Sequence, residues 1–506
     1  MFESKKANNM TSEKTNKTQS GPVKFSTQCV IGGRVLPAQS GETFETINPA
    51  TGEVLALVAR GDSADVDAAV SAARKAFDEG PWPQMSPSER KVVMQRFATL
   101  VEANIDELAM MESLEAGKPI SDCMEIDLPE TVNTLRWHAE AADKIYDQVS
   151  PSARGVVSMI VREPIGVVGV ILPWNFPLMM AAWKLGPILA TGCTAVLKPA
   201  EQTSLSTIRL AELATEAGVP DGVINVVPGF GETAGKAIGL HPAVDCVGFT
   251  GSTDTGRLFL KYAADSNLKR ILLECGGKNP MIVMADAEDL DVVADHAVNS
   301  IFWNMGENCS SNSRLLVHES LKDELLERLL ERTHDWVIGD PMDSSTRIGP
   351  MIEAIHLEKV LGHIQTAKDQ GARLVRGGQQ VRQDSGGYFV EPTIFDGVTA
   401  DMNIAREEVF GPVLAVLTFK TPEEAIAIAN DSDYGLAASV FTASNKTAHN
   451  AARSIRAGTV AVNCYGEGDV STPFGGYKQS GFGGRDKSLS AHDQYCEQKT
   501  IWIDLS

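Results

Sequence analysis

The stretch Ile165-Gly-Val-Val-Gly-Val-Ile-Leu172 decides the fold, because it begins a run of short apolar segments that alternate with helical patterns. Segments of the same kind follow at Thr194–Lys198, Val223–Val227, Asp245–Thr250 and Arg270–Glu274. Helical periodicity occupies the residues between them, to about 191 and over 203–217, 232–240 and 252–264. Nearly continuous apolar strands that alternate with helices are typical of a parallel, doubly wound sheet. The sequence therefore predicts an α/β fold.

Both flanks of this stretch carry further elements. Residues 63–78 have an apolar helical stripe, and SPSE at 86–89 is a capping box that opens a helix predicted to end near Gly117. A second α/β region is predicted from about residue 280 to about 480. Its first elements are expected as a helix over 287–303, a strand over 315–318 and a helix over 319–337. The alternating residues 499–505 could add an edge strand to a neighbouring chain.

The 506-residue chain is acidic but otherwise ordinary in composition. Lys and Arg number 45 and Asp and Glu 66, so the net charge is −21. This sign argues against nucleic acid or an anionic membrane surface as a partner, and no apolar run is long enough to span a bilayer. Eight scattered cysteines and the lack of a secretory signal predict a reduced, cytoplasmic setting. The spacing of His and Cys predicts no metal site, and residues 1–24 are predicted to be a disordered tail.

Three residues supply the parts for covalent acyl chemistry. Cys309, in NMGENCS, follows a predicted helix and is the candidate nucleophile, because N–H groups at a helix terminus can stabilise a thiolate. Glu274, in LECGGK, ends a predicted strand and is the candidate general base. Asn175, in PWNFP, is a candidate amide donor to an oxyanion. Each has an ordinary alternative explanation, since a buried cysteine is usually inert and a glutamate before two glycines can simply belong to a turn.

Candidate nucleotide contacts follow neighbouring strands, where ligands of such sheets bind. FTGSTDTG at 249–256 is a strand-to-helix turn whose N–H groups suit a pyrophosphate, although Ser252 or Thr253 could simply cap the helix. GFGETAG at 229–235 misses the dinucleotide fingerprint by one residue. Lys198 and Glu201, in KPAE, could hold ribose hydroxyls, and the carboxylate would repel a 2′-phosphate, which favours NAD over NADP. A surface ion pair explains these two residues equally well.

Taken in order, these motifs resemble the NAD(P)-dependent aldehyde dehydrogenase superfamily from about residue 25 onward. They are PWNFP, KPAE, FTGS, the segments of Glu274 and Cys309, EEVFGP at 407–412 and PFGGYKQSG at 473–481. The resemblance implies a Rossmann-like parallel-sheet cofactor domain, an α/β catalytic domain and a small β oligomerisation arm. The expected ranges are 25–147 with 165–276 for the cofactor domain, 277–482 for the catalytic domain, and 148–164 with 483–506 for the arm. It also implies a homo-oligomer, either a dimer or a tetramer.

The resemblance further implies how the chemistry would run and which residues would serve it. Cys309 would attack the aldehyde, Asn175 and the Cys309 N–H would hold the oxyanion, and Glu274 would activate water to hydrolyse a thioester. Lys184 and Asp486 resemble a proton-relay pair. Cofactor positions, for NAD with NADP as the alternative, are Leu172, Pro173, Trp174, Lys198, Glu201, Gly231, Gly251, Ser252, Gly256, Cys275, Glu408 and Phe410. Substrate positions are Phe176, Trp183, Asn308, Ser310, Glu467, Asp469 and Phe474.

Within the superfamily, the chain is most similar to the branch that oxidises ω-amino-, γ-glutamylamino- and guanidino-aldehydes in polyamine and arginine breakdown. This similarity rests on Gly-Asp at 468–469, PFGGYKQSG and RDKSL at 485–489. Glu467 and Asp469 could attract a cationic tail, although a solvated loop explains both acids as well. A broad aliphatic or semialdehyde dehydrogenase is the alternative. A silent binding or structural homologue would be expected to have lost Cys309 or Glu274.

Four departures from the superfamily pattern bear on the site. Glu307 is expected to add negative charge beside the nucleophile, and Cys275 to place a second thiol near it. Gly466 and Gly468 replace bulky residues and imply a wider substrate tunnel. SGFGGR at 480–485 is one residue longer than usual, which bears on the register of Asp486.

Overall fold

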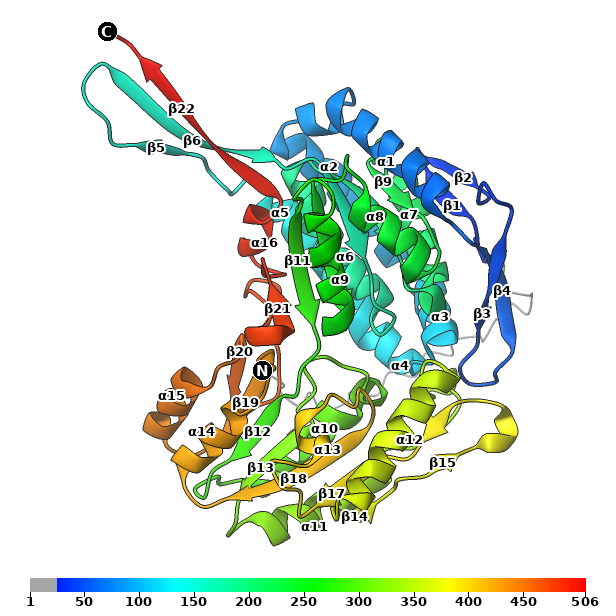
Figure 1. Cartoon of the computed structure of the whole chain (residues 1–506), viewed down its shortest axis with the longest axis vertical. Helices are drawn as coiled ribbons and strands as arrows, with labels where there is room; N and C mark the ends of the chain where they lie inside the picture. The colour runs from blue at the N-terminus through cyan, green and yellow to red at the C-terminus, as the bar shows by residue number, and fades with distance from the viewer. Residues whose placement is uncertain (1–24) are drawn as a thin grey trace, which may run out of the picture.

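The computed structural model describes residues 25–506, so the predicted disordered tail lies outside the described residues (Figure 1). An 8-stranded sheet forms the first half of the molecule, in the order β2-β1-β9-β8-β7-β10-β11-β21. Strands β9, β8, β7, β10 and β11 run parallel, as the sequence predicts. Their bounds, with those of the antiparallel edge strands, are Arg34–Leu36 (β2), Cys29–Ile31 (β1), Ile224–Val226 (β9), Thr194–Lys198 (β8), Val167–Ile171 (β7), Cys246–Gly251 (β10), Arg270–Cys275 (β11) and Gly481–Phe482 (β21).

The central strand β7 shows why this sheet is buried on both faces. Val168 and Val170 point into a core shared with one set of helices, whereas Val167 and Ile171 point into a second core on the opposite face. The alternation follows from the two-residue period of a strand. Helices on the first face are α2 (Pro87–Ala103), α5 (Leu128–Ala141), α6 (Pro177–Thr191) and α7 (Leu205–Glu216), and those on the second are α1 (Ser63–Asp78), α8 (Lys236–Leu240) and α9 (Thr253–Ala264).

A 7-stranded sheet forms the second half, in the order β14-β17-β18-β13-β12-β19-β20. Only β14 is antiparallel to its neighbour among these strands. The strands are Arg373–Arg376 (β14), Thr393–Asp396 (β17), Val413–Phe419 (β18), Arg314–His318 (β13), Pro280–Val283 (β12), Ala437–Phe441 (β19) and Thr459–Val462 (β20). The main helices are α10 (Leu290–Phe302), α11 (Lys322–Arg332), α12 (Ala354–Asp369), α14 (Pro422–Asn430) and α15 (Asn445–Ser454). The second predicted α/β region is therefore present.

A 3-stranded sheet projects from the first half as an arm (Figure 1). It consists of β22 (Cys496–Asp504), β6 (Val156–Pro164) and β5 (Gln148–Ser150). The last strand pairs within its own chain, with Ile501 opposite Met159, and leaves its outer edge free in this single chain. The remaining strands form two small hairpins, β3 (Thr43–Ile47) with β4 (Val54–Ala59), and β15 (Gln380–Val381) with β16 (Phe389–Val390).

Three boundaries differ from the sequence expectations. The helix expected from the capping box to Gly117 is broken at Asn104 into α2 and α3 (Ile105–Ala116), although Gly117 does end α3 in a left-handed conformation. The helix expected over 319–337 spans only α11, because a short turn follows it. Residues 483–494, which we assigned to the arm, lie against the first half: α16 (Ser490–Asp493) contacts α6, and Asp486 is buried.

No helix among residues 25–506 is both long and apolar enough to cross a membrane.

Candidate active site

Two cavities meet at Cys309. The first, of about 240 Å³, opens beside the carboxyl ends of β7, β10 and β11 and is also lined by segments of the second half. The second, of about 300 Å³, leads away between α5, α6 and the loop around Glu467. Cys309, Phe176, Met180 and Trp183 line both. A reacting group at Cys309 can therefore be approached from two sides.

The loop before Cys309 is a left-handed turn and not the start of a helix. Asn304 and Met305 have φ values of 51° and 56°, and Gly306 has a φ of 72°. A side chain on Gly306 would place its Cβ 2.3 Å from the backbone of Gly411. The α-helix that precedes this turn in the chain, α10, ends at Phe302 and so presents its carboxyl terminus. The expected stabilisation of a Cys309 thiolate by N–H groups at the end of this helix is therefore wrong, because a helix has its free N–H groups at its N-terminus.

Charge and burial both disfavour the Cys309 thiolate. Burial, followed by the carboxylates of Glu467, Glu408 and Glu274, raises the pKa of the Cys309 thiol well above its usual value. We expected Glu307 to be the opposing acid. Its carboxylate instead accepts a hydrogen bond from Ile352 N at 3.0 Å, Glu307 is not among the acids that raise the pKa of Cys309, and burial raises the pKa of Glu307 itself. Both effects on Cys309, burial and neighbouring negative charge, favour the protonated thiol over the thiolate.

Asn175 lies where an oxyanion donor is needed. Its side chain lines the first cavity together with Cys309 and is 6% exposed. Its Nδ2 donates to the carbonyl oxygen of Glu307 at 2.9 Å, and Asn304 Nδ2 donates to the same oxygen at 2.9 Å. Since a primary amide carries two hydrogens, the second N–H of Asn175 remains available to the cavity.

Glu274 ends β11 and lines the same cavity. Burial, and then the nearby Asp486 carboxylate, raise its pKa well above the usual range. Its Oε2 has no hydrogen-bond partner among the described residues. A Cβ on Gly475, whose φ is 157°, would lie 2.6 Å from Glu274 Oε1, so a side chain there would require the carboxylate to shift. A buried, unpartnered carboxyl with a raised pKa is suited to take a proton from water.

Lys184 and Asp486 form a buried ion pair beside this carboxylate. Lys184 Nζ lies 2.6 Å from Asp486 Oδ2, and the two side chains are 1% and 3% exposed. Asp486 also lines the first cavity. The pair predicted from the sequence is thus brought together, and the longer segment before Asp486 does not displace it.

The predicted cofactor residues divide into two groups. Those that line the first cavity are Pro173, Trp174, Gly251, Ser252, Cys275, Glu408 and Phe410, whereas Leu172, Lys198, Glu201, Gly231 and Gly256 do not line it. Lys198 Nζ pairs with Glu201 Oε2 at 2.9 Å. Ser252 caps α9 by accepting from Thr255 N, so the helix-cap explanation holds alongside its place in the cavity.

The wall of the first cavity includes His356 and Lys359 of α12, which the sequence analysis missed. His356 Nε2 donates to the carbonyl oxygen of Phe410 at 2.6 Å, and burial lowers the pKa of His356 to about 4. Phe410 has a φ of 57°, and its ring meets Trp174 edge-on at 5.3 Å. The neutral imidazole thus supports an aromatic residue held in an unfavourable backbone conformation. No sequence pattern distinguishes these two residues from others on an amphipathic helix.

The second cavity contains most of the predicted substrate residues. Phe176, Trp183, Asn308, Glu467 and Asp469 line it, whereas Phe474 lines the first cavity. Gly466 and Gly468 also line this cavity. Residues of its wall that the sequence did not predict are Ile126, Glu130, Met179, Met180, Trp303, Tyr465 and Lys487. A polar network joins the loop of Cys309 to this wall: Asn308 Nδ2 donates to Tyr465 OH at 2.7 Å, and Ser310 Oγ donates to Glu467 Oε1.

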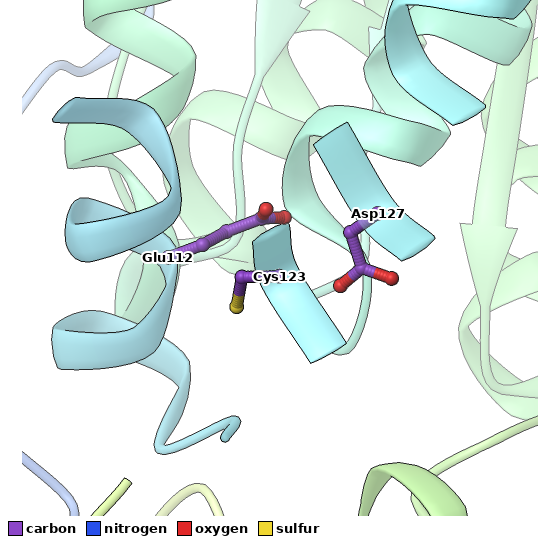
Figure 2. A group of neighbouring side chains, drawn as sticks. All are labelled: Glu112, Cys123 and Asp127. Atoms are coloured by element: carbon purple, nitrogen blue, oxygen red, sulfur yellow. The ribbon is translucent and has the colours of Figure 1, made fainter. Parts of the chain in front are cut away.

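One group among residues 25–506 has donor atoms close enough to hold a metal ion, although the sequence predicts none. The donors of Glu112, Cys123 and Asp127 lie within 4.8 Å of one another, with Glu112 reaching from α3 toward the helical segment that carries the other two (Figure 2). Lys118, completely buried, bonds to Asp127 and lies 3.8 Å from the centroid of the Phe176 ring. A fixed ammonium thus already compensates this charge, and it packs against Phe176, the residue that follows Asn175.

Comparisons with known proteins agree on one family. A model described as the aldehyde dehydrogenase family matches residues 36–501. The chain is 57% identical over 476 residues to an aminoacetaldehyde dehydrogenase of Pseudomonas aeruginosa, covering 94% of this chain and 95% of that protein. An alanine variant of the P. syringae indole-3-acetaldehyde dehydrogenase AldA, solved with NAD+ and IAA, superposes with a TM-score of 0.94 at 52% identity, covering 95% of this chain and 97% of that one. A γ-glutamyl-γ-aminobutyraldehyde dehydrogenase of Burkholderia cenocepacia J2315 superposes with a TM-score of 0.94 at 50% identity, covering 96% and 98%. With its sequence, its sheets and its cavities in agreement, the chain belongs to the aldehyde dehydrogenase family.

Proposed function

We propose that this protein oxidises an aldehyde to a carboxylic acid with NAD as the hydride acceptor, through a thioester on Cys309. The observation that carries the proposal is the position of Cys309 at the junction of two cavities. Candidate cofactor residues line one cavity and candidate substrate residues line the other. Asn175 and Glu274 line the first cavity within reach of the same junction. Such a combination of nucleophile, oxyanion donor and base is what acyl-transfer chemistry requires.

The residues divide the reaction between them. The Cys309 sulfur, once deprotonated, adds to the aldehyde carbon, and the free N–H of Asn175 with the Cys309 backbone N–H stabilises the resulting oxyanion. Loss of hydride from that carbon leaves a thioester. The carboxylate of Glu274 then takes a proton from water, which attacks the thioester and releases the acid. The Lys184–Asp486 pair lies beside Glu274 and is placed to receive that proton.

The first cavity suits a nicotinamide dinucleotide, which supplies a hydride acceptor when bound. Trp174 and Phe410 offer aromatic surface for the nicotinamide end. The Glu408 carboxylate, which accepts from Gly277 N at 2.8 Å, is a candidate to hold its ribose. Glu201 favours NAD over NADP, since a carboxylate repels a 2′-phosphate. Because Lys198 and Glu201 lie outside the cavity wall, we assign them to the adenosine end of the same site.

The second cavity favours an aldehyde with a cationic tail. Three acids, Glu130, Glu467 and Asp469, line it against one base, Lys487. Clefts lined by one sign of charge concentrate ligands of the opposite sign. The aminoacetaldehyde and γ-glutamyl-γ-aminobutyraldehyde dehydrogenases similar to this chain act on nitrogen-containing aldehydes by their names. An ω-amino-, γ-glutamylamino- or guanidino-aldehyde, of the kind produced in polyamine breakdown, is therefore the proposed substrate. A broad aliphatic or semialdehyde dehydrogenase is the second candidate, favoured only by the apolar residues of the tunnel wall.

A substrate panel with both cofactors tests this proposal. NADH and NADPH formation are followed at 340 nm with 3-aminopropanal, 4-aminobutanal, 4-guanidinobutanal and the uncharged butanal and hexanal. We expect the specificity constants to be highest for the nitrogen-containing aldehydes with NAD. The variant Cys309→Ala should remain folded and form no NADH. Turnover by that variant contradicts the mechanism, and a strong preference for hexanal contradicts the substrate class.

The arm is the proposed oligomerisation element of a dimer or tetramer. Its outer strand β22 exposes Trp502 by 65% of its surface and leaves its outer edge unpaired. An exposed edge strand with apolar side chains is a template for pairing with another chain. We further propose the domain division and the cytoplasmic setting given by the sequence, with residues 483–494 moved from the arm to the first half.

A further inference from the structure

The carboxylate of Glu467 reaches the loop of the nucleophile. Ser310, the residue after Cys309, donates its hydroxyl to Glu467 Oε1. Ser310 and Asn308 both bond to Tyr465 OH, at 3.1 Å and 2.7 Å, so this wall of the tunnel holds the loop on both sides of Cys309. Glu467 and Cys309 also line the same cavity. A change in charge at Glu467 therefore changes the electrostatic potential at the Cys309 sulfur.

No fixed cation neutralises this carboxylate among the described residues. The nearest base, Lys487, donates to the backbone carbonyl of Glu467 at 3.2 Å, and its ammonium lies over the rings of Trp183 and Phe474. No Lys, Arg or His nitrogen in residues 25–506 lies within 4.0 Å of the Glu467 side-chain oxygens. The other acids of the same cavity, Glu130 and Asp469, add negative charge.

Three carboxylates raise the pKa of Cys309, and the ammonium groups of Lys359 and Lys487 also line the cavities that meet there. Burial is the largest cause of the raised pKa of the thiol, and the carboxylates of Glu467, Glu408 and Glu274 follow in that order. Glu408 and Glu274 belong to the cofactor side of the site, whereas Glu467 belongs to the substrate side. Of the three, only Glu467 can be neutralised by a group that the aldehyde itself carries.

We propose that Glu467 is a specificity-determining residue that couples binding of the substrate's cationic end to activation of Cys309. In the empty tunnel its carboxylate opposes formation of the thiolate. An ammonium or guanidinium bound at Glu467 removes that opposition, so the nucleophile forms when a suitable substrate is in place. The inference rests on the proposed function and narrows it to short ω-amino- and guanidino-aldehydes, because Glu467 contacts the residue adjacent to Cys309. An uncharged aldehyde gains no such activation.

The pH dependence of Cys309 alkylation tests this coupling directly. The full-length protein is treated with iodoacetamide over a pH series, and modification of the Cys309 peptide is followed by mass spectrometry. We expect Glu467→Gln to move the inflection to lower pH by about one unit, the size typical of removing one close like charge. In the wild type, butylammonium should also lower the inflection, whereas butyramide, which is uncharged, should not. In the Glu467→Gln variant, butylammonium should not change the pH of the inflection.

Asp469→Asn is the matched control. Asp469 belongs to the same loop and lines the same cavity. Its carboxylate accepts hydrogen bonds from Ser471 N and Ser471 Oγ, at 2.8 Å and 2.6 Å, and not from Ser310. The Asp469→Asn variant should have a higher KM for aminoaldehydes than the wild type, but the pH of its alkylation inflection should be unchanged. An unchanged inflection in Glu467→Gln, or an equal shift in both variants, overturns the inference even if aminoaldehydes are good substrates. If no aldehyde is oxidised, the proposed function fails, while the alkylation inflection still reports whether Glu467 controls the thiol.

Discussion

Replacing Asn175 with alanine should lower kcat strongly and the free energy of unfolding only slightly. Its side chain makes one hydrogen bond, to the carbonyl oxygen of Glu307, and that oxygen keeps a second donor in Asn304 Nδ2. Removal of Asn175 therefore leaves no buried acceptor without a partner. The loss of this bond should lower the free energy of unfolding by about 0.5–1.5 kcal/mol.

The expected catalytic loss is much larger. If the free N–H of Asn175 stabilises the oxyanion, its removal costs about 3–4 kcal/mol in the transition state, or a decrease in kcat of about 10²–10³-fold. KM should change little, because the charge on oxygen develops only in the transition state. The assay combines steady-state NADH formation with urea-induced unfolding of the same protein preparation.

Asn279→Ala provides the contrast. Asn279 Nδ2 donates to the carbonyl oxygens of Cys309 and Ser311, at 2.7 Å and 3.0 Å, and its Oδ1 accepts from Ala437 N. Its removal strips partners from buried backbone groups and should cost more stability than Asn175→Ala, about 1–3 kcal/mol for each group left unsatisfied. A kcat within about threefold of wild type in a folded Asn175→Ala protein would refute the oxyanion role. So would a catalytic loss that simply follows stability across the two variants.

Three further changes have defined outcomes. Lys118→Met leaves Asp127 as a buried, unpaired charge and should lower the free energy of unfolding by about 3–5 kcal/mol. Adding Asp127→Asn should restore most of that stability. If urea denaturation gives the single and double variants equal stability, this charge pairing is excluded. Glu274→Gln should give one NADH per subunit and then stop, because deacylation loses its base. In the wild type, the raised pKa of Glu274 means that its carboxylate is lost to protonation at a higher pH than for an ordinary carboxyl, so steady-state turnover should fall as the pH decreases. A pH-independent kcat, or full turnover by the variant, contradicts its role. Trp502→Asp should shift the assembly toward monomer in sedimentation velocity, and an unchanged mass would exclude β22 from the interface.

The parts of this protein that the sequence predicts are those set by local pattern. The apolar segments around Val168 became parallel strands because only a strand buried on both faces accommodates such a run. Asn175, Glu274 and Cys309 were identifiable because each stands in a distinctive motif at a strand end or turn. Gly117 ended its helix as predicted, because glycine readily takes the left-handed conformation.

The parts that the sequence could not predict depend on which distant segments meet. Glu130 and Tyr465 enter the tunnel from α5 and from the loop after β20, and nothing in either segment distinguishes them from surface or core residues. The break at Asn104 divides a continuous helical pattern that tertiary packing overrides. The surroundings of Cys309 were not predictable for a similar reason, since the left-handed conformations of Asn304 and Met305 form a turn between the end of α10 and Cys309.

The pairing of Lys184 with Asp486 has a consequence for how the protein is made. The two residues are 302 positions apart, and Phe474 and Gly475 reach the same site from the same late segment. During synthesis, the parallel strands β7 to β11 of the first sheet can emerge and begin to fold long before these residues leave the ribosome. A nascent chain that already carries Cys309 would then lack the carboxylate neighbour of Glu274, so that unfinished or truncated products carry a thiol without the means to complete a turnover.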